Sequence, residues 1–120
     1  MNAHVVLVFS TDPLAAALLG AAVELAGYRP TFPDDGEPSR DAVMRLRPQA
    51  ALVDCDHVDA CTERFFGPAL MVGARVAVFS SSRSQRTLDP IAEQFSVRQF
   101  TLPIEFPALQ LLLAELTRRP

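Results

Sequence analysis

The chain has 120 residues, of which 49% are apolar and 21% are charged, a balance typical of one folded domain and not of a disordered chain. Its formal net charge of −3, with arginines scattered along the sequence, argues against a nucleic-acid-binding surface, which needs a concentrated basic stripe. No apolar run reaches the length of a membrane span, and the first residues do not resemble a signal peptide, so we expect a cytoplasmic protein with reduced cysteines.

The first part of the chain predicts a strand, a tight loop and a helix. Residues 5–9 form an uninterrupted apolar run, typical of a central strand that is buried on both faces. Asp12 can cap a helix, Pro13 suits its first position, and Gly27 supplies its C-terminal stop. Apolar residues recur at helical spacing and predict the core-facing side of this helix as Leu14, Leu18, Ala21 and Leu25.

The next segment leads to a strand that ends in a carboxylate. Residues 28–32 predict a weak strand, which two prolines place at a sheet edge. An acidic, turn-rich loop over 34–38 precedes a short helix from about 39 to 45. Residues 50–53 then predict a buried strand that stops abruptly at Asp54. In an open parallel sheet, ligands and chemistry gather beyond the carboxyl ends of the strands, so Asp54 stands where a functional group is expected.

The rest of the chain repeats the alternation of helix and strand. The predicted elements are a helix over 60–72, a strand over 75–79, a short helix between 84 and 95, a strand over 97–101 and a helix from 107 to about 118. Pro68 should break or kink the first of these helices. The core stripe of the last helix is predicted as Leu109, Leu112, Leu113 and Leu116. Five strands alternating with five helices predict one three-layer α/β domain over residues 1–120, with a parallel sheet.

Several short motifs, taken in order, resemble the receiver domain of two-component response regulators. They are Ser-Thr-Asp-Pro at 10–13, Ala-Gly-Tyr at 26–28, Arg-Pro-Gln-Ala-Ala-Leu-Val-Asp at 47–54, Val-Ala-Val-Phe-Ser-Ser at 76–81 and Leu-Pro-Ile at 102–104. The resemblance covers essentially the whole chain. It implies a flavodoxin-like (CheY-like) fold with strand order 2-1-3-4-5 and a role in signal transduction.

The resemblance also assigns roles to individual residues. Asp54 matches the family's phosphoacceptor aspartate, and Ser80 matches the hydroxyl residue that hydrogen-bonds the phosphoryl group. Pro103 matches the proline that follows the family's lysine. The surface formed by the fourth helix, fifth strand and fifth helix is the usual partner or dimer face of receivers. Leu111, which lies off the core stripe of the last helix, is expected to be partly exposed there, and we predict a homodimer through this face.

The chain departs from the receiver pattern at the charged positions. The acidic pair that holds Mg²⁺ falls on Ser10 and Thr11, the lysine falls on Leu102, and the aromatic switch residue falls on Gln99. A phosphoryl group transferred to a carboxylate needs positive charge beside it, and Mg²⁺ prefers carboxylate oxygens. The sequence therefore predicts a degenerate receiver, or pseudo-receiver, that needs no cofactor and works by binding a kinase or another signalling protein.

Two alternatives remain open. In the first, the chain is a working receiver with an altered magnesium site, to which Asp12, Asp54 and Asp56 contribute. In the second, it is a flavodoxin-like module for a small ligand or anion, with hydroxyl donors at Ser10, Thr11, Ser80 and Ser81. An enzyme is the least favoured class, because no nucleophile–base pair is visible. The spacing of Cys55 and Cys61 argues against a zinc site.

Overall fold

A computed structural model describes residues 4–10, 12–54, 63–80, 98–101 and 104–117. Within them lies one five-stranded sheet of order β2-β1-β3-β4-β5, in which every neighbouring pair is parallel. The strands are β1 (Val5–Phe9), β2 (Arg29–Thr31), β3 (Ala50–Asp54), β4 (Arg75–Ser80) and β5 (Arg98–Thr101). The predicted strand order is confirmed, and the proline-containing strand β2 lies at an edge as expected.

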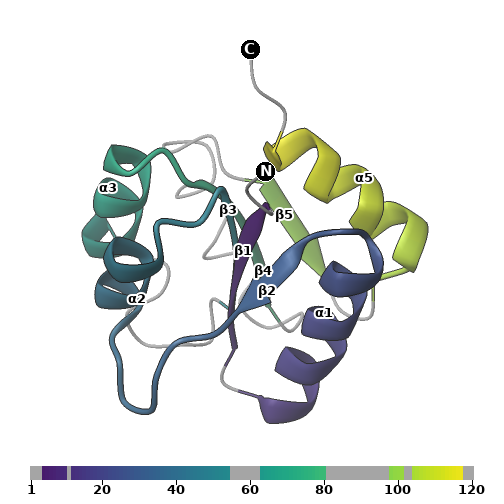
Figure 1. Ribbon diagram of the computed structural model, residues 1–120, viewed down its shortest axis with the longest axis horizontal. Helices are drawn as coiled ribbons and strands as arrows, with labels where there is room; N and C mark the ends of the chain where they lie inside the picture. Colours follow the sequence, from purple (N-terminus) through teal and green to yellow (C-terminus); the bar gives the residue numbers. More distant parts are fainter. Residues whose placement is uncertain (1–3, 11, 55–62, 81–97, 102–103, 118–120) are drawn as a thin grey trace.

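Helices cover both faces of this sheet (Figure 1). The structure describes α1 (Pro13–Leu25), α2 (Ser39–Leu46), α3 (Glu63–Met71) and α5 (Phe106–Thr117). α2 and α3 lie on one side of the sheet, and α1 and α5 lie on the other. Four helices thus belong to the described residues, against five expected. The remaining one, predicted between 84 and 95, falls outside the described residues.

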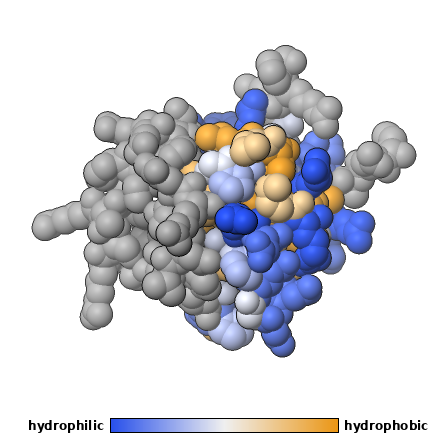
Figure 2. Space-filling model, turned by 90° about the vertical axis from the view of Figure 1, so that its left-hand side faces the viewer, coloured by the Kyte–Doolittle hydropathy of each residue, from blue (hydrophilic) through white to orange (hydrophobic). Residues whose placement is uncertain are grey.

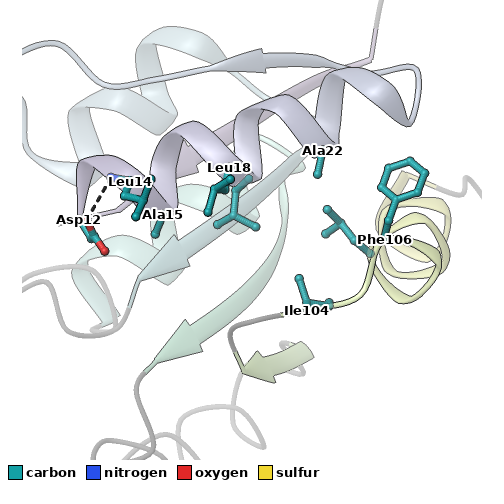
Figure 3. A pocket seen from close by; sticks show the side chains of 9 residues that line it. Asp12, Leu14, Ala15, Leu18, Ala22, Ile104 and Phe106 are labelled. Carbon is teal, nitrogen blue, oxygen red and sulfur yellow. Dashed lines mark hydrogen bonds between the residues drawn. The ribbon is translucent and has the colours of Figure 1, made fainter.

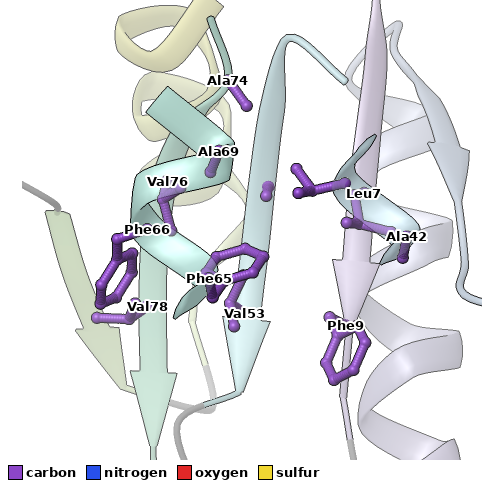
Figure 4. Packing of buried hydrophobic residues seen from close by; sticks show 12 residues of the cluster. Leu7, Phe9, Ala42, Val53, Phe65, Phe66, Ala69, Ala74, Val76 and Val78 are labelled. Carbon is purple, nitrogen blue, oxygen red and sulfur yellow. The ribbon is translucent and has the colours of Figure 1, made fainter. Parts of the chain in front are cut away.

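Two apolar cores result from the alternation of side chains along the strands. On β1, Leu7 and Phe9 face α2 and α3, whereas Val6 and Val8 face α1 and α5. The core on the α2–α3 side is closed by Phe65 from α3 and is drawn in Figure 4. Because both faces are covered, the central strands are apolar at nearly every position, which explains why continuous apolar runs predicted them.

The prediction for the core side of α1 is wrong. The residues of α1 that are buried against the sheet are Leu19, Gly20 and Val23. The four residues expected to face the core, Leu14, Leu18, Ala21 and Leu25, are all exposed and form the outer stripe of α1. The helix is apolar around most of its circumference, so helical spacing of apolar residues did not identify the buried side.

α3 also differs from expectation. The helix is continuous from Glu63 to Met71 with Pro68 inside it, so of the predicted break or kink the break is absent. Proline removes one backbone N–H from the helix, but Phe65, Phe66 and Ala69 are completely or almost completely buried and anchor the helix on the sheet. This burial outweighs the local cost of the proline.

The ends of α1 agree with the capping residues that the sequence predicted, whereas the end of α2 involves a strained residue. The side chain of Asp12 accepts a hydrogen bond from the backbone N–H of Leu14, with Pro13 in the first helical position. Gly27 ends α1 at a φ of 94°. α2 ends differently, because Arg47 adopts the left-handed conformation at a φ of 45°, which is strained for a residue with a Cβ.

Candidate functional site

The carboxyl ends of β1 and β3 bring Ser10 and Asp54 together. The two strands are neighbours, with Val8 beside Leu52 and Phe9 beside Val53 in register. One step further along each strand stand Ser10 and Asp54. Both residues continue the alternation toward the α1–α5 side of the sheet, so their side chains leave the sheet edge on the same side.

Asp54 is a buried carboxylate beside a hydroxyl group. Its exposure is 5%, and its Oδ2 lies 3.5 Å from the Oγ of Ser10, the outer limit of a hydrogen bond. The same hydroxyl lies 3.2 Å from the backbone carbonyl of Asp12. A serine hydroxyl has a single proton, so it donates to one of these oxygens at a time. At the described contact, Asp54 therefore meets a neutral donor at the position where the receiver pattern has a carboxylate.

Ser10 and Asp12 also organise the loop between β1 and α1. The backbone N–H of Asp12 donates to Ser10 Oγ at 3.1 Å, so the Ser10 hydroxyl stabilises the turn that leads into α1. The Oδ1 of Asp12 accepts from the backbone N–H of Leu14 at 3.0 Å. Asp12 thus directs one carboxylate oxygen at the N-terminus of α1 and serves as its cap. That contact uses Oδ1, so a cation bound by Asp12 would take its other carboxylate oxygen.

The remaining predicted site residues are only partly described. Ser80 is the last residue of β4, one position beyond Phe79, the residue paired with Asp54. Its backbone is therefore next to the strand end that carries Asp54. The other predicted site residues lie outside the described residues; they are Thr11, Asp56, Ser81, Leu102 and Pro103.

The receiver fold implies a magnesium ion at this edge of the sheet, and such an ion needs several oxygen ligands from the protein. Over residues 4–10, 12–54, 63–80, 98–101 and 104–117, no group of three His, Cys, Asp or Glu side chains is arranged to hold a metal ion. Asp54 faces Ser10, and Asp12 caps α1. Hydroxyl and carbonyl oxygens carry no net charge to offset the dehydration of Mg²⁺. The described residues do not fit a magnesium site.

The loop between β2 and α2 borders the same edge of the sheet and was not predicted as part of the site. It forms a hollow of about 440 Å³ next to Ser10, lined by Phe32, Pro33 and the acidic residues of 34–37. Residues 34–38 follow the carboxyl end of β2, and this position was the signal that could have placed them at the site.

An ion pair holds this loop against α2. Arg45 donates from Nε to Glu37 Oε2 at 2.8 Å and from Nη2 to Glu37 Oε1 at 2.7 Å, a two-point contact between guanidinium and carboxylate. The backbone N–H of Asp34 donates to the same carboxylate at 2.9 Å. The hydrogen bonds from Arg45, and after them the one from Asp34, lower the pKa of Glu37 from 4.5 to about 2. Glu37 therefore stays ionised throughout the neutral and mildly acidic range.

Comparison with known proteins was informative at the level of structure only. No protein-family model matches the sequence, and no curated protein matches it. Solved structures match over nearly the whole chain. A signal receiver domain of a modulated diguanylate cyclase from Desulfovibrio desulfuricans is 24% identical, with a TM-score of 0.76, and the alignment covers 97% of this chain and 94% of that one.

Two further structures agree with this match. The receiver domain of a sensor histidine kinase from Pseudomonas aeruginosa, which has a magnesium ion coordinated in its active site cleft, is 17% identical with a TM-score of 0.78, over 97% of this chain and 98% of that one. A protein from Burkholderia pseudomallei described as pilus assembly-related is 24% identical with a TM-score of 0.72, over 94% and 88% of the two chains. The chain has the flavodoxin-like fold of receiver domains, as the sequence predicted. None of its described helices is long and apolar enough to cross a bilayer.

Proposed function

We propose that this chain is a pseudo-receiver, a signalling module that keeps the receiver fold and binds a protein partner without phosphorylation of Asp54. The observation that carries the proposal is the contact of a 5%-exposed carboxylate with the Ser10 hydroxyl, at the edge where a receiver needs magnesium ligands. We also propose that the module is not an enzyme. We place it in the cytoplasm, a reducing compartment in which its two cysteines would stay thiols.

The electrostatics of phosphoryl transfer support this proposal. A phosphoryl group attached to Asp54 would bring about two negative charges to a buried position, and catalysis of such a transfer depends on cations that neutralise them. One opposite charge at about 4 Å contributes on the order of 4 kcal/mol at an effective dielectric constant near 20. The sequence has leucine at 102, where a receiver has its lysine, and serine at 10, where a receiver has a carboxylate that holds Mg²⁺. The transferred group would therefore lack the positive charge of the lysine and that of the metal ion.

The two alternatives have weaker support. A working receiver with an altered site would use Asp12 as a ligand, but one oxygen of Asp12 is engaged with the N–H of Leu14. An anion-binding module would use the N-terminus of α1, and the carboxylate of Asp12 already occupies the N-cap position there. Asp12 thus has only its other carboxylate oxygen to offer a cation, and an anion bound at this helix end would lie next to the negative charge of the cap.

The proposed partner is a protein such as a kinase or another signalling protein, and the β5–α5 side remains a predicted contact surface. Leu111 is 69% exposed there, as expected. Arg98 and Glu115 form an ion pair on the same side, so Leu111 has charged neighbours. The homodimer through this face stays a prediction, with one exposed leucine among the described residues to support it.

Incubation with acetyl phosphate and Mg²⁺, followed by intact-mass measurement, tests the proposal. We expect no species that carries an added phosphoryl group, either in the wild type or in the control variant Asp54→Asn. A stoichiometric, Mg²⁺-dependent gain of one phosphoryl group that disappears in Asp54→Asn would show that the site is active and would overturn the proposal.

A further inference from the structure

The outer stripe of α1 is an unusual surface for a helix that faces solvent. Its leucines Leu14, Leu18 and Leu25 are 66%, 64% and 77% exposed. From Pro13 to Val23 the sequence contains no charged residue. A helix that is apolar on every side is normally buried on every side. The exposed side of α1 therefore has the composition of a covered surface.

This surface continues into a groove between α1 and α5 (Figure 3). The groove has a volume of about 490 Å³, and Leu14, Leu18 and Ala22 from α1 face Ile104 and Phe106 across it. Among the described residues that line the groove, Asp12 alone is charged. The outer stripe of α1 and this groove together form one surface, the α1–α5 face. A contiguous apolar face of this kind marks an interaction surface, whereas single exposed leucines do not.

The opposite side of the molecule shows what an ordinary outer surface of this chain looks like. α2 exposes Arg40, Asp41 and Arg45, and its described surroundings mix hydrophilic and hydrophobic areas (Figure 2). Exposed Met71 and Leu70 lie on α3, so apolar side chains occur there too, but charged residues stand on the neighbouring helix. The outer side of α1, without a charged residue from Pro13 to Val23, thus differs from the outer side of α2.

We propose that the α1–α5 face binds a second copy of this chain, with the α1 helices of the two copies antiparallel about a two-fold axis. The outer stripe follows the alternating spacing of four, three and four residues that is found in coiled-coil seams. An antiparallel pair centred between Leu18 and Ala21 sets Leu18 of one copy against Ala21 of the other, and Leu14 against Leu25. The symmetry repeats each contact, so a large side chain meets a small one twice.

Charge and area favour a second copy as the occupant. A two-fold axis brings the centre of a surface against itself, and a charged centre would repel its own copy, whereas the centre of α1 is uncharged. The 13 residues of α1 and the 12 of α5 give helices roughly 20 Å long. Two such helices side by side, each about 10 Å wide, offer a face of roughly 400 Å² in projection. Because side chains make the surface uneven, its accessible area is larger than its projected area. This area approaches the lower end of the area that each partner buries in a stable interface, about 600–800 Å². The inference goes beyond the proposed function and does not depend on it.

Sedimentation velocity across a concentration series measures this self-association. We expect a reversible dimer in the micromolar range, as befits an interface of this size. Leu18→Glu, on an exposed position, should weaken the dimer at least about tenfold. Met71→Glu is the matched control, because it changes an exposed apolar side chain of α3, on the opposite side of the sheet, and should leave the dimer unchanged. Circular dichroism and thermal unfolding establish that both variants are folded.

A charge-pairing experiment tests the register. Leu18→Glu and Ala21→Lys should each be monomeric alone, whereas their equimolar mixture should recover a dimer, because the pairing places the introduced carboxylate of one copy against the introduced ammonium group of the other. A wild-type chain that stays monomeric at every concentration would overturn the proposal and leave the face to a different protein. A dimer lost in Leu111→Glu but kept in Leu18→Glu would also overturn it, and would assign self-association to the β5–α5 side.

Discussion

Replacement of Ser10 by aspartate would place a second carboxylate against Asp54 and so test the electrostatic description of the site. Ser10 Oγ lies 3.5 Å from Asp54 Oδ2, so the two charges in Ser10→Asp would be about 4 Å apart. At an effective dielectric constant near 20 their repulsion is about 4 kcal/mol. Ser10 is half-buried and its replacement can turn toward water, so we expect a loss of roughly 2–3 kcal/mol in the free energy of unfolding.

Urea denaturation of wild type, Ser10→Asp and the uncharged control Ser10→Asn at pH 7 measures this difference. Ser10→Asn is expected to lose less than about 1 kcal/mol, since it keeps a neutral donor beside Asp54. Mg²⁺ should stabilise Ser10→Asp more than the wild type, because two adjacent carboxylates attract a cation that one does not. If Ser10→Asp is as stable as Ser10→Asn without metal, then Asp54 is not a charged neighbour of position 10, and the description of the site is wrong.

Three further predictions concern the loop beside the site, the end of α2 and the packing of α1. The lowered pKa of Glu37 means that its ion pair with Arg45 stabilises the fold fully above about pH 4.5 and loses this effect as the pH falls toward 2; in acid titrations followed by circular dichroism, Glu37→Gln should lack this part of the pH dependence. Arg47→Gly should raise the free energy of unfolding by roughly 0.5–1 kcal/mol in urea, because glycine adopts the left-handed conformation without strain; an unchanged or lower value would contradict the strain at Arg47. A Cβ at Gly20 would lie 2.7 Å from the ring of Phe32, so Gly20→Ala should stabilise by about 1 kcal/mol only when Phe32 is also replaced by alanine; equal effects in both backgrounds would exclude this contact.

The sheet and its edge were predictable from the sequence because the signals there are local. The apolar runs of β1 and β3 mark strands covered on both faces, and parallel strands bring their carboxyl ends to one edge. That is enough to place Ser10 beside Asp54. The cap of α1 was also predictable, because Asp12 and Pro13 act within one turn of helix.

The orientation of α1 could not be predicted from the same kind of signal. Periodicity identifies a buried side only where the opposite side is polar, and α1 offers no such contrast. Tertiary packing selected Leu19 and Val23 for the core and left Leu14 and Leu18 outside. The proposed dimer gives this surplus of apolar surface a physical reason.

The contact between Glu37 and Arg45 could not be predicted from the sequence for a different reason. The two residues are eight positions apart and belong to a loop and a helix, so their meeting depends on how the acidic loop folds back over α2. No periodic pattern encodes that geometry. The acidic composition of 34–37 indicated only a turn, although the hollow beside Ser10 is lined by these residues.

The central claim, that the carboxyl edge of the sheet keeps an acceptor carboxylate without a magnesium site, is tested most directly by NMR. Amide spectra of the wild-type chain would be recorded during titration with millimolar Mg²⁺ and then with beryllofluoride. We predict that the amide signals of Ser10, Asp54 and their strand neighbours stay where they are at every addition. Saturable shifts centred on Ser10 and Asp54, enhanced when both reagents are present, would contradict the account.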